Sequence, residues 1–235
     1  MPYLKFISDS DLLEAIKKLI QKIENAERDV DSKLYKNVLD PFSALFEGIT
    51  HGISYNVWLK SEKVRQIQKT MQNAVGDFHQ DILGSIDGCE NMGSGGGLDI
   101  CNRKKKIVAE IKNKFNTTKG NHKIEIYDAI KSKLKDPRFK GFVGYYVEII
   151  PSKKKIYDLP FTPSDNKIKK RRASDPKIRI IDGKSFYDLV VGRPFALQEL
   201  FEALPNVIAE NFQYKFDKKE VVKYLELFAK AYEVR

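Results

Sequence analysis

An aspartate and a glutamate lie eleven residues apart near the middle of the chain, and a lysine follows the glutamate two positions later. They are Asp99, Glu110 and Lys112, and Ile111 separates the last two. Mg²⁺ is usually held by one or two carboxylates together with waters and phosphate oxygens, and a nearby lysine stabilises charge that develops on a phosphate. The residue types predict a centre for metal-assisted phosphodiester hydrolysis, in which Asp99, Glu110 and the backbone carbonyl of Ile111 bind Mg²⁺.

The role expected for Lys112 has two alternatives. The lysine either orients the attacking water or stabilises the negative charge of the pentacovalent phosphorus, and its sequence position leaves both open. Two further acids, Glu47 and Asp81, belong to helical segments upstream and are candidates for an additional carboxylate. Glu47 is also explained as an ordinary acid on the surface of a helix.

Two short strands joined by a basic turn must position these residues. Leu98-Asp99-Ile100 forms the first strand, and the apolar run 106–112 forms the second. Side chains alternate between the two faces of a strand, so Glu110 and Lys112 share one face and Ile111 points to the other. A turn centred between residues 104 and 105 sets Asp99 opposite Glu110, which brings two carboxylates to one point.

The remaining pattern predicts an α/β protein with a mixed β-sheet flanked by helices and a helical N-terminal region. Helices are expected over residues 9–29, 34–48, 58–84, 122–135, 184–191, 195–203 and 218–232, and further strands over 142–150 and 178–181. Pro41 either kinks the second helix or begins it, with Asp40 as the cap. The order hairpin, helix, strand predicts a right-handed crossover.

We expect a single endonuclease domain over residues 1–235. Its parts are a helical N-terminal region of residues 1–84, a catalytic α/β core of 85–182 and a helical C-terminal region of 183–235. Within the core, the Lys-, Pro-, Ser- and Asp-rich segment 151–177 is expected to form a mobile loop, whose basic cluster 167–172 either clamps DNA or remains an unstructured charged loop. The glycine cluster 93–97 lacks the Gly-Lys-Ser/Thr of a phosphate-binding loop. We interpret it as a segment with few side chains that lets the backbone approach the site closely.

The net charge of +10 is concentrated in one segment of the chain. Residues 101–180 carry 23 Lys and Arg against 8 Asp and Glu, whereas residues 1–100 carry 11 against 15 and residues 181–235 carry 8 against 9. A basic segment between balanced ends is typical of a surface that neutralises nucleic-acid phosphates. A solvated lysine-rich surface is the alternative.

Several classes of protein are disfavoured by what the sequence lacks. The chain has neither a run of eighteen apolar residues nor a leader-like N-terminus, so a soluble, cytoplasmic protein is expected. Cys89 and Cys101 are too few for a disulfide framework or a cysteine-based zinc site and are expected to be reduced thiols. His51, His79 and His122 lack a metal-binding spacing such as H-E-x-x-H.

The segments around the three candidate residues also resemble a known family. Leu98-Asp99-Ile100, the run 109–114 and the run 116–122 resemble the PD-(D/E)xK type II restriction endonucleases, in particular the family that cuts GGNCC-like sites, and the stretch 76–84 is similar too. The resemblance covers about residues 75–150. It implies a Mg²⁺-dependent homodimer that cuts both strands of a short palindrome in double-stranded DNA, with Asp99, Glu110 and Lys112 in the catalytic roles. Leu98 stands where this family usually has proline.

The polar loop that follows the second strand of the hairpin is expected to contact DNA. Its amide, hydroxyl and amino groups suit hydrogen bonds to phosphates and base edges. The candidate contacts are Asn113, Lys114, Asn116, Thr117, Thr118, Lys119, Asn121 and His122. The alternative is an ordinary strand-to-helix connection in which Asn121 caps the next helix.

Two other functions are compatible with the same residues. One is a DNA repair or junction-resolving nuclease of the same fold, which would act on branched or nicked DNA instead of a short palindrome. The other is a non-enzymatic DNA-binding protein, whose binding would be independent of Mg²⁺ and of Glu110.

Overall fold

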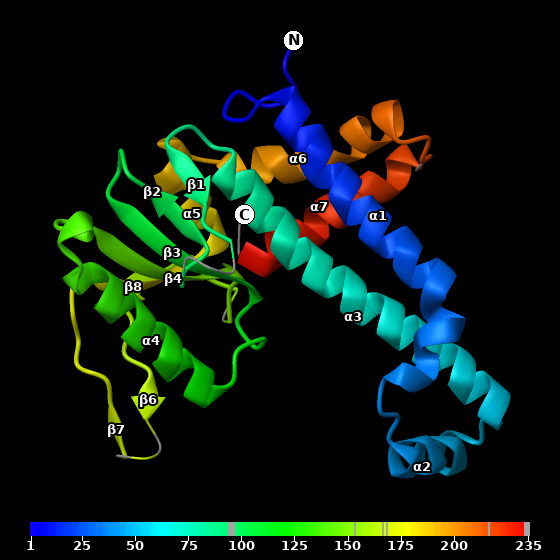
Figure 1. Ribbon diagram of the computed structural model, residues 1–235. Helices are drawn as coiled ribbons and strands as arrows, with labels where there is room; N and C mark the ends of the chain where they lie inside the picture. The colour runs from blue at the N-terminus through cyan, green and yellow to red at the C-terminus, as the bar shows by residue number, and fades with distance from the viewer. Residues whose placement is uncertain (94–96, 153, 166, 168, 216, 233–235) are drawn as a thin grey trace. The chain divides into compact units, whose positions relative to one another are not determined.

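The structure, a computed structural model, describes residues 1–93, 97–152, 154–165, 167, 169–215 and 217–232 (Figure 1). It divides into two compact units, a helical unit of Ile16–Phe78 and an α/β unit that comprises Met1–Ala15 and His79–Arg235. Both boundaries fall inside long helices, α1 (Asp9–Lys33) and α3 (Tyr55–Gly84). The chain therefore passes between the units along continuous helices. Ser94, Gly95 and Gly96 of the glycine cluster, and Ile168 of the basic cluster, lie outside the described residues.

The helical unit contains a short helix, α2 (Pro41–His51), between a 3₁₀ turn (Leu34–Lys36) and the start of α3. The Asp40 carboxylate accepts hydrogen bonds from the backbone amides of Phe42 (3.0 Å) and Ser43 (3.2 Å). The first amides of a helix have no carbonyl partner within the helix, and the Asp40 carboxylate supplies one. Proline is also favourable at the first helical position. Of the two alternatives for Pro41, the structure therefore shows that it begins the helix.

A six-stranded mixed sheet forms the centre of the α/β unit. Its strands follow the order β1 (Cys89–Asn91), β2 (Ile100–Asn102), β3 (Ile107–Lys114), β4 (Val143–Ile150), β8 (Ile178–Asp182) and β5 (Asp158–Pro160). The pairs β1–β2 and β2–β3 are antiparallel, β3–β4 and β4–β8 are parallel, and β5 closes the edge antiparallel to β8. The predicted mixed α/β fold is confirmed, although the three-residue strand β1 was not predicted.

Strands β2 and β3 form the predicted hairpin, but the first strand was predicted at residues 98–100 and begins only at Ile100, so Leu98 and Asp99 precede it. Ile100 pairs with Ala109 and Asn102 pairs with Ile107, so the hairpin turns midway between residues 104 and 105, as the strand spacing indicated. The Asn102 side-chain oxygen accepts a hydrogen bond of 2.8 Å from the backbone amide of Lys105, which stabilises the turn.

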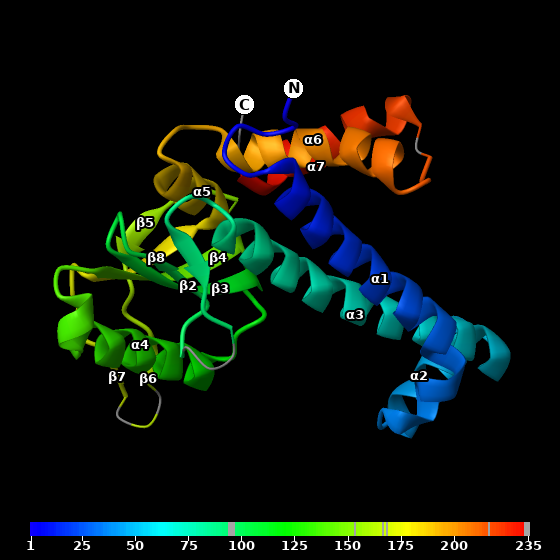
Figure 2. The ribbon, with the colours of Figure 1, turned by 45° about the horizontal axis from the view of Figure 1, so that its top comes forward.

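Helices cover the two faces of this sheet. Helix α4 (Gly120–Lys135) connects β3 to β4 and lies on one face, and α5 (Gly183–Val191) lies on the other (Figures 1 and 2). A Cβ atom at Gly144 of β4 would lie 2.2 Å from Cγ2 of Ile130, so α4 can approach the sheet this closely only because residue 144 is glycine. The core on the α4 side consists of Leu98, Cys101, Val108, Ile126, Tyr127, Ile130, Phe139, Phe142, Tyr146, Phe161 and Ile178.

The C-terminal part is helical, as predicted, with α6 (Ala196–Asn211) and α7 (Lys218–Tyr232) following α5. The predicted end of α6 at residue 203 was wrong, because the helix continues through Pro205. Val207 beyond the proline is fully buried, and this burial offsets the hydrogen bond that proline cannot make. The Tyr232 hydroxyl donates to the Ile149 carbonyl (2.7 Å), which joins α7 to β4. In the described chain, no helix combines the length and apolarity needed to cross a membrane.

The segment 151–177 is not the continuous loop that its composition predicted. It contains β5 and a small ladder of β6 (Ser164–Asp165) with β7 (Lys170–Arg171). Phe161 is only 3% exposed and stacks on Tyr146 with ring centroids 4.8 Å apart. The prediction was wrong because the buried Phe161 anchors the segment to the core. Apolar residues scattered among many polar ones gave no strand-like pattern in the sequence.

Candidate active site

Asp99 comes directly before β2 and is bonded to β3 on both sides of Glu110. Its backbone amide donates to the Ala109 carbonyl (2.9 Å), and its carboxylate Oδ2 accepts from the Ile111 amide (2.7 Å). The hairpin therefore places the Asp99 side chain beside the Glu110 segment. The predicted proximity of these two acids follows from the register of two short strands.

Glu110 and Lys112 lie on the face of β3 that α4 covers. Their side chains are 14% and 24% exposed, whereas Ile111 between them is 2% exposed on the opposite face. The Lys112 Nζ donates a hydrogen bond of 2.6 Å to Glu110 Oε1. The ammonium group and the carboxylate are thus held together on one half-buried surface, as the strand alternation predicted.

The neighbouring strand β4 supplies a third acid, which the sequence analysis missed. In the parallel register, Lys112 pairs with Glu148, and the Glu148 side chain is 2% exposed. Its Oε1 accepts from Lys123 Nζ of α4 (2.9 Å), and its Oε2 accepts from the Tyr157 hydroxyl. The sequence did contain one indication of this residue, a single glutamate within the apolar run 142–150. A carboxylate buried in such a strand needs hydrogen-bond or charge partners.

Tyr146 lies on β4 in register with Glu110, two residues before Glu148. Burial is the main cause that raises the pKa of its hydroxyl, and the negative charges of Glu148 and Glu110 add to the effect. The Lys123 ammonium lies 5.3 Å from the centroid of the same ring. The Tyr146 hydroxyl therefore remains neutral, and Lys123 supplies the counter-charge of Glu148.

Most of the predicted DNA contacts are exposed, either in the connection between β3 and α4 or in the first turn of α4. Of these eight residues, Asn113 and Lys114 are half-buried at the end of β3, Thr118 is buried, and the other five are exposed, namely Asn116, Thr117, Lys119, Asn121 and His122. The Thr118 hydroxyl makes no hydrogen bond within the part of the chain that the structure describes. Helix α4 begins at Gly120 with Lys119 at the cap position, so the alternative role of Asn121 as the cap was wrong.

The other acids and the cysteines have structural partners of their own. Glu47 accepts a hydrogen bond from Arg65 (3.1 Å) within the helical unit, and Asp81 accepts one from Asn91 (3.4 Å) at β1 of the α/β unit. Both cysteines are free thiols, as predicted, and burial raises the pKa of Cys89 and of Cys101. Neither thiol is therefore activated as a nucleophile.

The donor set of the candidate centre suits a cation that completes its shell with other oxygens. Among the described residues, no group of three His, Cys, Asp or Glu side chains is placed to hold a metal ion. The centre offers two carboxylates, Asp99 and Glu110, and this is the number that Mg²⁺ commonly takes from a protein when waters and phosphate oxygens supply the rest. The residues present therefore fit Mg²⁺ bound together with a nucleic-acid substrate.

The hairpin of this mixed sheet carries an acid directly before its first strand and acid-x-lysine on its second. This is the arrangement of a PD-(D/E)xK nuclease. The model of the Eco47II restriction endonuclease family matches residues 4–213. The chain is 42% identical over 237 residues to the type II restriction enzyme Eco47II of Escherichia coli, covering 97% of this chain and 99% of that enzyme. It is 34% identical over 235 residues to the type II restriction enzyme Sau96I of Staphylococcus aureus, covering 98% and 88% respectively.

The chain therefore belongs to the Eco47II restriction endonuclease family. It is a type II restriction endonuclease, a site-specific nuclease that acts on DNA, and the activity predicted from the sequence is confirmed. The family assignment favours restriction cleavage over the junction-resolving and non-enzymatic alternatives.

Proposed function

We propose that this enzyme uses Mg²⁺ at Asp99, Glu110 and the Ile111 carbonyl, and that it cuts both strands of a short palindrome as a homodimer. A GGNCC-like sequence is the proposed site. The observation that carries the catalytic assignment is the hydrogen bond of 2.7 Å from the Ile111 amide to Asp99, which holds one carboxylate beside Glu110. Lys112 lies on the same face as Glu110 and completes the set.

Each residue has a defined task in this proposal. Asp99 and Glu110 provide the negative charge that retains the cation next to the scissile phosphate. The chemistry supplied by Mg²⁺ when bound is polarisation of that phosphate and a lowered pKa of the attacking water. Lys112 either orients this water or stabilises the charge of the pentacovalent phosphorus, and its ion pair with Glu110 keeps the ammonium at the centre before DNA arrives.

The DNA surface proposed here extends from the candidate centre along the start of α4. Exposed amide, hydroxyl and amino groups between β3 and α4 can donate to phosphates and base edges, and the basic excess of residues 101–180 supplies long-range attraction. Lys114 and Lys119 are the proposed phosphate contacts, and Asn116, Thr117 and Asn121 are proposed to contact bases or sugars. Asn113, Thr118 and His122 complete the proposed set.

The direct test is cleavage of a fully sequenced plasmid. Wild-type enzyme with Mg²⁺ is expected to produce discrete fragments whose mapped ends share one short palindrome, and a chelator is expected to abolish the reaction. Asp99→Ala and Lys112→Ala are expected to produce no fragments, while both variants still bind the plasmid. An absence of cleavage by the wild type would refute the proposal, and so would full cleavage by both variants.

A further inference from the structure

Helix α2 presents its apolar residues to solvent. Phe42 (71% exposed), Leu45 (59%), Phe46 (63%) and Ile49 (68%) follow the spacing i, i+3, i+4, i+7, and no residue of α2 is buried. A surface helix normally buries such a stripe against its own protein. We call these four residues the α2 stripe.

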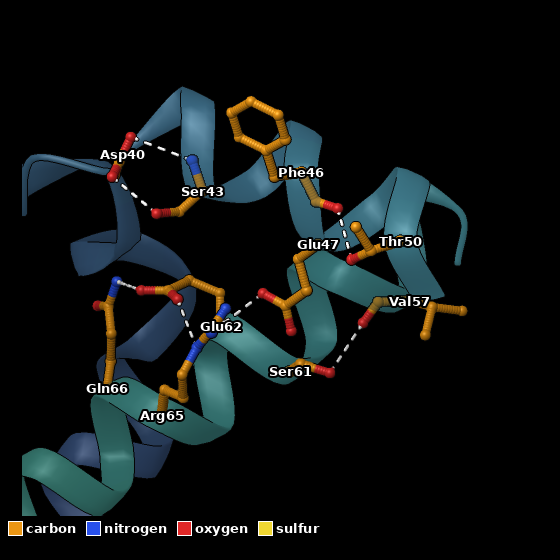
Figure 3. A network of polar contacts seen from close by, with 10 residues as sticks. All are labelled: Asp40, Ser43, Phe46, Glu47, Thr50, Val57, Ser61, Glu62, Arg65 and Gln66. Carbon is orange, nitrogen blue, oxygen red and sulfur yellow. Dashed lines mark hydrogen bonds and ion pairs between the residues drawn. The ribbon is translucent and has the colours of Figure 1, made fainter. Parts of the chain in front are cut away.

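The side of α2 that faces its own unit carries two small residues, Ala44 and Gly48, together with Glu47. Glu47 is one of the half-buried residues of this helix, and its carboxylate accepts a hydrogen bond of 3.1 Å from Arg65 on α3. Figure 3 shows the Glu47 side chain pointing toward Arg65 and the Phe46 ring pointing away from this network. The Glu47–Arg65 bond therefore connects α2 to α3, while the α2 stripe stays exposed to solvent.

An apolar groove in the same unit includes two residues of the α2 stripe, Leu45 and Ile49, in its wall. Its volume is about 670 Å³, and it is bounded by α2, the 3₁₀ turn and the start of α3. Its lining includes Tyr35, Leu39, Ile49, Ile53, Tyr55 and Trp58. Of the nineteen exposed large apolar side chains in the described part of the chain, eight lie within residues 35–57, and we call the surface of this segment the apolar patch.

This patch carries very little charge. Residues 35–58 contain only Lys36, Asp40 and Glu47 as charged residues in a chain of net charge +10. Asp40 is engaged by the amides at the start of α2, and Glu47 is engaged by Arg65 (Figure 3). DNA would require cations here, whereas a second copy of a basic protein would meet the least like-charge repulsion at this surface.

We propose that the α2 stripe and the adjacent groove form the contact with a second copy of this chain. Phe42 and Phe46 are exposed on α2, the helix that borders the groove, so each copy presents both exposed aromatic rings and an apolar recess. A two-fold contact is made by the same patch on both subunits. The aromatic rings of each copy can then occupy the apolar recess of the other. The inference rests on the homodimer of the proposed function and assigns it an interface.

The size of the patch is sufficient for a stable dimer. Eight large apolar side chains, each burying roughly 100 Å², would remove about 800 Å² per subunit, which is the share of one partner in a standard interface. Apolar residues that project from a short helix into a groove are a recurrent mode of helix recognition.

Sedimentation velocity of the full chain, without DNA or Mg²⁺, tests the interface. The wild type is expected to be a dimer at micromolar concentration. Leu45→Glu and Phe46→Glu are each expected to weaken dimerisation by roughly 30-fold or more, whereas Phe46→Leu keeps the dimer. The matched control is Leu227→Glu on α7, because Leu227 is also on a helix and is 63% exposed against 59% for Leu45. Circular dichroism and thermal unfolding verify that each variant is folded.

The outcomes separate this inference from the proposed function. A monomeric wild type, dimeric Leu45→Glu and Phe46→Glu variants, or dissociation by Leu227→Glu alone would each overturn the assigned interface. Loss of DNA binding in dimeric α2 variants would show that the patch faces DNA, and would overturn it too. Glu110→Gln is expected to remain dimeric and inactive; if it cleaves DNA, the catalytic assignment fails while the interface result stands unchanged.

Discussion

The carboxylate of Asp99 accepts a hydrogen bond of 2.7 Å from the backbone amide of Ile111, the residue between Glu110 and Lys112. This bond connects the residue before β2 to the middle of β3, so the two arms of the hairpin are joined at the candidate centre. A hydrogen bond to an ionised carboxylate is stronger than one between neutral groups, and it restricts the Asp99 side chain to one orientation. The negative charge is thereby held beside Glu110.

Asp99→Asn separates the charge of this residue from its hydrogen bond. The amide oxygen of asparagine can still accept from Ile111, so the hairpin is expected to remain intact. The loss of one carboxylate is expected to reduce single-turnover cleavage with Mg²⁺ by roughly 10³-fold, because less charge holds the cation at the phosphate. DNA affinity without metal, measured by fluorescence anisotropy, is expected to stay within about threefold of the wild type.

The matched control for Asp99→Asn is Asp87→Asn. Asp87 is 87% exposed and pairs with Lys104 at the hairpin turn. This variant removes the same charge from the same unit and is expected to cleave at the wild-type rate. A rate for Asp99→Asn within tenfold of the wild type would contradict the metal-binding assignment.

Lys119→Ala is expected to weaken DNA binding without changing sequence preference. Lys119 is exposed at the start of α4, and a phosphate contact there releases about one counterion. In the proposed homodimer the substitution removes one such contact per subunit, so affinity measured over a series of salt concentrations should show a slope reduced by about 2 for cognate and unrelated DNA alike. Lys60→Ala, an equally exposed change on α3 outside the basic segment, should leave the slope unchanged, and identical slopes for the two variants would refute the contact.

Glu148→Gln is expected to destabilise the fold by about 2–3 kcal/mol, because Lys123 would lose a buried counter-charge. Glu148 is 2% exposed and accepts from Lys123 at 2.9 Å. Asp158→Asn serves as the comparison, since its partner Arg179 and Asp158 itself are 25% and 39% exposed, and such pairs contribute less than about 1 kcal/mol. Urea unfolding measures the free energy of unfolding of both variants. Equal decreases would show that the Glu148–Lys123 pair contributes no more to stability than the more exposed pair.

Stability is expected to fall on acidification because of His79. This half-buried residue hydrogen bonds to the Tyr187 hydroxyl (2.9 Å), and burial lowers its pKa from 6.5 to about 4. Between these two values the unfolded chain binds a proton that the folded chain does not, so stability present above pH 6.5 is lost progressively as the pH falls toward 4. The loss is about 2 kcal/mol by pH 5.

His79→Gln tests this assignment, because glutamine can hydrogen bond to Tyr187 without titrating. Urea unfolding of the wild type and of the variant at pH 7 and pH 5 provides the comparison. The variant is expected to lose about 2 kcal/mol less than the wild type between the two pH values. An unchanged pH dependence would show that other groups are responsible.

The sequence by itself determined the local geometry of the candidate centre. The spacing of Asp99 and Glu110 around a short turn set the hairpin register, and the two-residue period of a strand placed Glu110 and Lys112 on one face. The helices of the chain were likewise predicted from apolar periodicity, and the last one, 218–232, matches α7 in both bounds. These features depend on residues close in the chain, where backbone geometry alone decides which side chains meet.

Only the tertiary structure decided which residues from distant segments join or leave that centre. Glu148 lies 36 positions after Lys112 and reaches it through the parallel pairing of β3 and β4, and Phe161 turns an apparent loop into part of the core. Thr118 is buried although its neighbours are exposed, and α2 turns its apolar stripe outward. Burial and strand pairing arise from contacts between segments that are far apart in the chain, so a local pattern does not specify which of these residues meet.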